Sequence, residues 1–123
     1  MNVLIFHCSC LEGNYTLKAD WTAEGLTWTV ETDIEALQGN TGELSSVKEF
    51  SDLLEKADIP HWERRYEADG SAIEDAVRWD LKLDTDGNTY LSEGEETFFP
   101  YGYEALIDAL ALIDPQVRYF SYR

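Results

Sequence analysis

The segment from residue 77 to residue 92 limits the possible folds of this chain more than any other. Its first half, Val77-Arg78-Trp79-Asp80-Leu81-Lys82-Leu83-Asp84, places an apolar residue at every second position, the period of a strand with one buried face. Asp86-Gly87 follows, and this dipeptide between alternating residues is a strong signal for a two-residue hairpin turn. With Asn88–Ser92 as the returning strand, the segment predicts a β-hairpin with one apolar face.

Two other segments predict strands. Residues 3–9 form a short run in which both faces are largely apolar, a pattern typical of a central strand. Residues 15–32 contain two alternating stretches around the turn Thr22-Ala23-Glu24-Gly25, which predicts a second hairpin. The polar, glycine-containing stretch Gln38–Gly42 predicts a loop.

Two segments predict amphipathic helices. Residues 46–57 carry apolar side chains at helical spacing, and Ile59-Pro60 ends the pattern. Residues 102–113 repeat it, and Asp114-Pro115 ends that second helix. Each helix therefore has one apolar stripe that must pack against another element.

The order strand, hairpin, helix, hairpin, helix predicts an α+β fold. We expect a single domain over residues 1–123, with one antiparallel sheet of about five strands and two helices packed on one face. The other face of the sheet is then left to solvent or to a partner. The tail, residues 117–122, is compatible with a last strand.

The second half of the chain also resembles a known family. The shared pattern is Ile59-Pro60-His61-Trp62, Asp69-Gly70, Trp79-Asp80-Leu81-Lys82-Leu83, Asp86-Gly87, and Pro100 before the closing helix. Over roughly residues 44–113 it resembles small uncharacterised bacterial proteins with a Trp-x-Leu-x-Leu strand, an Asp-Gly turn and a closing amphipathic helix. The resemblance implies an α+β fold and no particular chemistry, because that family carries no assigned activity.

The charge of the chain is extreme. It has 25 Asp and Glu against 9 Lys and Arg, a formal net charge of −16. This argues against binding nucleic acid or an anionic membrane through a basic face. A composition that is 44% hydrophobic and 13% aromatic argues against an acidic disordered tail. Two interpretations stay open: a charge that keeps the domain soluble, and a surface matched to a basic partner.

The apolar segments are too short to cross a membrane, which takes about 20 consecutive residues. The start, Met1–Cys8, lacks the basic residues of a secretory signal. Cys8 and Cys10 lie two residues apart on a predicted strand, a poor arrangement for bridging each other. We therefore expect a cytoplasmic protein with reduced, buried thiols.

One segment has the spacing of a calcium-binding loop. From Asp84 to Glu95, oxygen-bearing side chains fall at the first, third, fifth, ninth and twelfth positions. Thr89 occupies the position where such a loop needs glycine, and the flanks predict strands rather than helices. A hairpin is therefore the favoured interpretation, and we expect no metal and no cofactor.

No motif in the chain predicts catalysis. The sequence has neither a nucleophile motif nor a glycine-rich phosphate loop, and its carboxylates are too many to single out a catalytic pair. His7, on an apolar strand, is interpreted as a core residue. Arg64-Arg65 is predicted to pair with Glu63 and Glu67. We expect that the protein is not an enzyme.

The preferred hypothesis is a non-catalytic acidic inhibitor or immunity-type protein. Its carboxylates would bind the basic nucleic-acid-binding surface of a nuclease or CRISPR effector and block access by nucleic acid. In general character the chain is similar to acidic anti-CRISPR proteins and DNA mimics. The candidate contacts are acids expected on turns and helix exteriors: Glu43, Glu49, Asp52, Glu55, Asp84, Asp86, Glu93, Glu95 and Glu96.

The alternative hypothesis is an accessory module that binds another protein through an aromatic patch, with the charge serving solubility. Residues 98–122 are rich in Phe and Tyr, and tyrosine is enriched at interfaces because its ring is apolar and its tip polar. Tyr119 and Phe120 are the candidate contacts of this patch.

Overall fold

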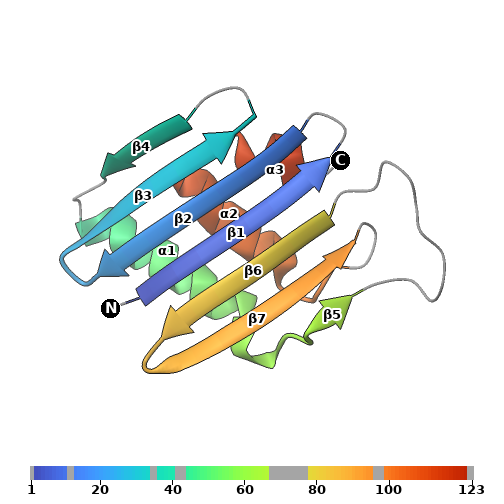
Figure 1. The fold of residues 1–123 in the computed structure, drawn as a ribbon. Helices are drawn as coiled ribbons and strands as arrows, with labels where there is room; N and C mark the ends of the chain where they lie inside the picture. The colour runs from blue at the N-terminus through green and yellow to red at the C-terminus, as the bar shows by residue number, and fades with distance from the viewer. Residues whose placement is uncertain are drawn as a thin grey trace.

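The chain folds around one twisted sheet. The computed structural model describes residues 2–10, 13–33, 36–40, 44–66, 78–95 and 99–121. The sheet has seven strands in the order β4-β3-β2-β1-β6-β7-β5, and all neighbours are antiparallel except β5 and β7 (Figure 1). The strands are β1 (Asn2–Cys10), β2 (Gly13–Thr22), β3 (Gly25–Thr32), β4 (Ala36–Asn40), β5 (Arg65–Tyr66), β6 (Arg78–Thr85) and β7 (Asn88–Glu95).

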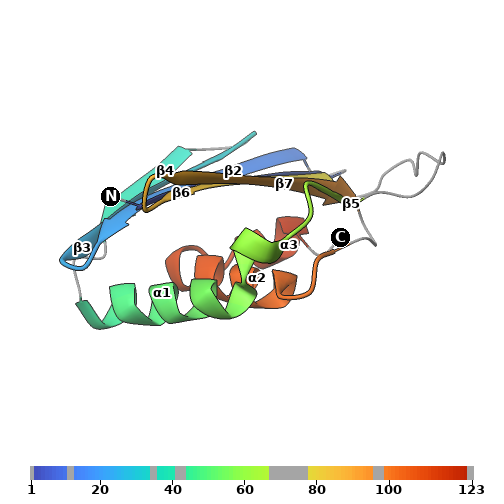
Figure 2. The same cartoon turned by 90° about the horizontal axis from the view of Figure 1, so that it is seen from below.

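The helices lie on one side of the sheet, and the other side is left uncovered by helices (Figure 2). They are α1 (Leu44–Ala57), the 3-10 turn η1 (Ile59–His61), α2 (Tyr103–Ile113) and α3 (Val117–Ser121). None of the described helices is long and apolar enough to cross a membrane. The α+β class and the packing of two main helices on one face of a mostly antiparallel sheet confirm the prediction from the sequence.

Alternation along β1 explains its central place in the sheet. Leu4, Phe6 and Cys8 point toward the helices and are fully buried, while Ile5 and His7 point to the uncovered face. β2 pairs with one edge of β1 and β6 with the other, so that Phe6 lies between two apolar neighbours of those strands. The prediction of a central strand is confirmed.

The Asp86-Gly87 turn also forms as predicted. Asp86 has φ 51° and Gly87 has φ 80°, so both central residues are left-handed, as a type I′ turn requires. This turn matches the right-handed twist of the two strands that it joins. It fixes the register of β6 against β7 with Thr85 opposite Asn88.

Three elements differ from the expectation. The sheet has seven strands rather than about five. β4, which includes residues 38–40 of the expected loop 38–42, pairs with β3, and β5 pairs with β7 over two residues. Such short edge strands pair through backbone hydrogen bonds and do not require alternating apolar side chains. The sequence pattern therefore does not predict them. The tail forms α3 rather than a strand, since Val117 and Phe120 are both buried and a three-residue spacing shares one face only in a helix.

Candidate functional site

A row of polar side chains crosses the uncovered face of the sheet. His7 lies opposite Thr16 of β2 and Asp80 of β6, Asp80 lies opposite Glu93 of β7, and Glu93 lies opposite Arg65 of β5. These residues share one face because residues directly opposite each other in a sheet point to the same side. The fold therefore gathers charged groups from four strands that are distant in the sequence.

The contacts within this row are ionic. His7 Nδ1 lies 3.3 Å from Asp80 Oδ2. Glu93 Oε1 lies 2.9 Å from Arg64 Nη1 and 3.3 Å from Arg65 Nε. Partial burial raises the pKa of the Asp80 carboxyl, and the nearby Glu93 charge raises it further. His7 and Arg64 act in the opposite direction and lower this pKa. The side chains of His7 and Asp80, with Glu93, line a shallow cavity of about 280 Å³.

Two sequence-based expectations about this face need correction. His7 is half-buried on the uncovered face and paired with Asp80, rather than a core residue, because the apolar residues of β1 that face the helices are the even-numbered ones. Arg64 and Arg65 lie against Glu93 rather than only beside their neighbours in sequence, because β5 pairs with β7. Of the acids expected to pair with them, Glu67 lies outside the described residues.

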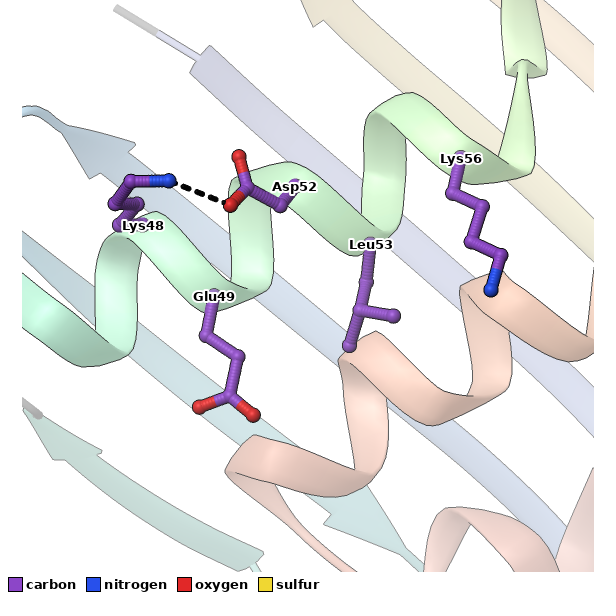
Figure 3. Close-up of a pocket in the computed structure, with 5 residues that line it drawn as sticks. All are labelled: Lys48, Glu49, Asp52, Leu53 and Lys56. Carbon is purple, nitrogen blue, oxygen red and sulfur yellow. Dashed lines mark hydrogen bonds and ion pairs between the residues drawn. The ribbon is translucent and has the colours of Figure 1, made fainter.

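The outer surface of α1 carries the second group of charges. Lys48 Nζ pairs with Asp52 Oδ2 at 2.7 Å, one turn apart on the helix. Figure 3 shows Glu49 and Leu53 projecting from the side of α1 opposite this ion pair. With Lys56 these residues line a cavity of about 420 Å³ that is open to solvent.

Most of the cations are used within the molecule. Of the eight lysines and arginines in the described ranges, six form ion pairs with carboxylates: Lys48 with Asp52, Arg64 and Arg65 with Glu93, Arg78 with Glu95, Lys82 with Asp84, and Arg118 with Asp108. Within those same ranges, ten carboxylates form no ion pair with Lys, Arg or His. One is the buried Asp114, and the other nine are Asp20, Glu24, Glu31, Asp33, Glu49, Glu55, Glu63, Asp86 and Glu104. All of these nine except Asp20, which is half-buried, are exposed. Among the described residues, the unpaired negative charge therefore lies mostly on exposed side chains.

Four carboxylates lie at the same end of the sheet. Val3, at the start of β1, lies opposite both Asp20 of β2 and Asp84 of β6. Since neighbouring strands are about 4.8 Å apart, Asp20 and Asp84 lie about 10 Å apart on the uncovered face. Glu24 and Asp86 are in the two hairpin turns that extend from this same end (Figure 1). We call Asp20, Glu24, Asp84 and Asp86 the turn-end carboxylates.

The predicted acidic contacts are divided between different parts of the molecule. Glu49, Asp52 and Glu55 lie on α1, whereas Glu93 and Glu95 lie on the uncovered face of the sheet. One flat partner surface cannot cover both layers at once. The other predicted acids are Asp84 and Asp86 at the turn end, and Glu43 and Glu96, which lie outside the described residues.

Sequence reasoning missed Asp20 and Glu24. Both residues lie in the β2–β3 hairpin, which was predicted. The local sequence pattern does not show that the turn of this hairpin and the Asp86-Gly87 turn extend from the same end of the sheet. The two turns lie at the same end because β1 pairs with β2 on one edge and with β6 on the other. The strand order is thus the signal that identifies them.

The segment from Asp84 to Glu95 is a hairpin, not a calcium-binding loop. Asp84 lies opposite Thr89, next to the turn, whereas Glu95 lies opposite Arg78 at the far end of β7. The first and last oxygen ligands of a calcium loop would have to converge on one ion, and here the strands hold them apart. In the part of the chain that the structure describes, no group of three or more His, Cys, Asp or Glu residues could hold a metal ion.

The described residues of the predicted aromatic patch are divided between the core and the surface. Phe120 is only 6% exposed, and its ring stacks on Tyr15 with centroids 5.0 Å apart. Tyr103 is also buried, whereas Tyr119 is 51% exposed and Tyr101 is fully exposed. Phe120 therefore stabilises the fold and is not available to a partner, because one side of the short helix α3 must pack against the sheet.

Comparison with models of known protein families finds no match, and comparison with curated proteins finds no significant one. The resemblance of residues 44–113 to small bacterial proteins therefore stays a prediction. The function of the chain has to be inferred from the placement of its own residues.

Proposed function

We propose that the protein is a non-catalytic inhibitor that binds the basic nucleic-acid-binding surface of a partner, such as a nuclease or a CRISPR effector. Bound there, it blocks access by nucleic acid. The observation that carries the proposal is the pairing of charges. Most described cations are held by carboxylates of the chain itself, while ten further carboxylates in the described ranges, all but Asp114 at least partly exposed, form no ion pair.

A surface of this kind attracts a groove that evolved to bind phosphates. Lysine and arginine grooves concentrate anions, and complementary charge accelerates association by orders of magnitude at low salt. The chain carries a net charge of −16, and a folded sheet holds the carboxylates in fixed positions. Rigid placement lowers the entropy lost on binding, which a flexible acidic tail cannot avoid.

The turn-end carboxylates are the best candidates for the contact. Asp20, Glu24, Asp84 and Asp86 lie on two hairpins at the same end of the sheet. Within the described ranges only Lys82 pairs with any of them, at 3.9 Å from Asp84. Glu93 and Glu95, by contrast, are already neutralised by arginines. The proposal therefore assigns the contact to the turn end rather than to the far end of β7.

The test is competition between the protein and labelled DNA for purified nucleases and CRISPR effectors, measured by fluorescence anisotropy at low and high salt. The triple variant Asp20→Asn, Glu24→Gln, Asp86→Asn should slow association about tenfold or more at low salt. The matched control is Glu93→Gln with Glu95→Gln, which should change association little because these acids are already paired.

Two outcomes would overturn the proposal. One is displacement of DNA that does not depend on salt, because a charge-driven complex weakens as the Debye length falls. The other is full inhibition by the triple variant together with loss of inhibition in Tyr119→Ala. That result would favour the alternative of an accessory module, for which Tyr119 and Tyr101 are exposed aromatic residues in the described part of the patch.

A further inference from the structure

The edge of β7 that faces away from β6 is paired over only part of its length. β5 lies opposite Glu93 and Gly94, and the Glu93 N–H donates to the Arg64 carbonyl at 3.0 Å. From Asn88 to Ser92, no strand among the described residues pairs with this edge. Figure 1 shows β5 beside the far end of β7 only. Among the described residues, the half of β7 near the hairpin turn therefore has an open edge.

The hairpin turn determines which backbone groups of β7 point outward. In a two-residue hairpin the closing pair, here Thr85 and Asn88, is hydrogen-bonded, and the bonds then recur at every second residue. Thr89, Leu91 and Glu93 lie between the residues that bond to β6, so their backbone groups point away from β6. The bond from the Glu93 N–H to the Arg64 carbonyl agrees with this alternation. Thr89 and Leu91 therefore direct their N–H and C=O groups away from β6, toward the open edge.

The open edge lacks the features that normally protect an edge strand. Exposed edges usually carry charged side chains, proline or a bulge, each of which discourages the addition of another strand. Residues 88–92 read Asn-Thr-Tyr-Leu-Ser, with neither a charge nor a proline, in a chain whose net charge is −16. Leu91 in this stretch is 45% exposed. The edge is therefore suited to accept a strand.

A cavity lies beside this edge on the uncovered face. It measures about 360 Å³, and its lining includes Ile5, Lys82 and Leu91. These three residues form one row across the sheet, because Ile5 lies opposite Lys82 and Lys82 lies opposite Leu91. A strand added to β7 would place one of its side chains beside Leu91, where the apolar surfaces of Leu91 and Ile5 favour an apolar residue.

The next side chain of such a strand on the same face lies beside Thr89. Asp84 is directly opposite Thr89 and accepts a hydrogen bond from its hydroxyl, and Asp86 is in the adjoining turn. Two carboxylates thus lie near this position. They favour a Lys or Arg, whose long side chain can reach across Thr89.

We propose that the open edge of β7 binds an extended segment of a partner protein by strand addition. The segment has an apolar residue beside Leu91 and a Lys or Arg two positions away, beside Thr89. A second copy of this chain is a poor occupant, since both copies carry −16. The basic character of the segment rests on the proposed function, whereas strand addition rests on the backbone geometry of β7 alone.

The probe is a short, capped peptide of alternating valine and lysine, with an N-methylated version that cannot form the ladder as its control. Hydrogen exchange measured by NMR should show the Thr89 and Leu91 amides become protected when the peptide binds. Leu91→Pro should lower the affinity of the peptide by up to about tenfold, because it removes one outward donor and leaves the bonds to β6 intact.

A matched variant tests the other edge of the sheet. Counted from the closing pair Thr22 and Gly25, the same alternation directs the Gln38 N–H of β4 outward. Gln38→Pro should therefore leave peptide affinity unchanged. Peptide binding without protection of the two β7 amides would overturn the proposal, and this measurement on the unaltered chain does not depend on how the variants fold.

The remaining outcomes are also informative. A dimer in sedimentation that disappears in Leu91→Pro would identify a second copy as the occupant and overturn the assignment to a basic segment. Protection of the β7 amides without any displacement of DNA from nucleases would support strand addition and contradict the proposed function. Displacement of DNA with β7 unprotected would support the proposed function and contradict strand addition.

Discussion

The Tyr15 hydroxyl donates a hydrogen bond to Asp114 Oδ2 at 3.0 Å, and both side chains are buried. The two residues are 99 positions apart, so this bond joins β2 to the end of α2. Asp114 Oδ1 also accepts from the Gln116 backbone N–H at 3.2 Å, which holds the turn into α3. Burial raises the pKa of Tyr15 far above its ordinary value, and the Asp114 carboxylate adds to the increase.

Replacement of Tyr15 by Phe should lower the free energy of unfolding by about 1–3 kcal/mol, because a buried carboxylate then loses one of its donors. The ring and its stacking on Phe120 are kept. Urea unfolding followed by circular dichroism measures the change. Tyr119→Phe, at an exposed position, is the control and should have almost no effect. Equal stability of Tyr15→Phe and the unaltered chain would contradict a structural role for the bond.

The same tyrosine makes the fold sensitive to alkaline pH. In the unfolded chain Tyr15 ionises near its ordinary pKa of 10.0, whereas in the folded chain its pKa is higher. The folded state thus favours the protonated phenol. The contribution of this difference in pKa to the free energy of unfolding is fully present below pH 10 and is lost as the pH rises above that value. Unfolding in urea at several pH values between neutrality and pH 11 should show a steeper decline for the unaltered chain than for Tyr15→Phe.

Gly94 is required by close packing rather than by backbone conformation. A Cβ atom there would lie 2.6 Å from the Tyr66 backbone oxygen and 3.0 Å from Trp79 Cζ2. Gly94→Ala should therefore cost about 1–3 kcal/mol and change the near-ultraviolet signal of the tryptophans, because β5 or Trp79 must shift. Differential scanning calorimetry with near-ultraviolet circular dichroism tests this.

Gly87 provides the matched comparison for Gly94. No atom lies within 4 Å of a Cβ atom built there, but its φ is +80°. Gly87→Ala should cost about 1–2 kcal/mol through backbone strain alone and leave the tryptophan signal unchanged. If both variants gave the same spectrum, the explanation by close packing at Gly94 would fail.

Phe120 and Tyr119 are neighbours in sequence that should behave differently. Phe120→Ala should lower the free energy of unfolding by about 3–5 kcal/mol, since it removes a buried ring that stacks on Tyr15. Tyr119→Ala should cost about 1 kcal/mol or less, because half of its surface is exposed. Thermal unfolding of both variants decides whether α3 is anchored by Phe120. A smaller loss in Phe120→Ala than in Tyr119→Ala would contradict the packing.

Self-repulsion among the unpaired carboxylates should make stability depend on salt. Raising the ionic strength from about 0.01 M to about 0.15 M shortens the Debye length from about 30 Å to about 8 Å. The melting temperature should rise by a few degrees over this range, because repulsion falls more in the compact state than in the unfolded chain. A variant with Glu49→Lys and Glu55→Lys should show a smaller rise. A melting temperature independent of salt would contradict net repulsion.

The sequence by itself determined the local structure. Alternation in Arg78–Thr85, together with Asp86-Gly87, was enough to predict a hairpin. A two-residue turn combined with side chains that alternate between two faces allows only one pairing register. The apolar spacing of α1 and α2 was enough to predict two helices on one face, because each stripe must be buried. These features depend on residues that are close together in the chain.

The tertiary structure decided which charges are free and which edge is open. Glu93 looked like any other acid in the sequence, yet β5 and β7 hold it between Arg64 and Arg65. Asp20 and Asp84 are brought together only by the central strand β1. Pairing between distant strands sets these contacts, and local side-chain patterns do not encode the order of strands in a sheet. In a chain with a net charge of −16, the order of the strands therefore decides where the described carboxylates lie and which of them are paired.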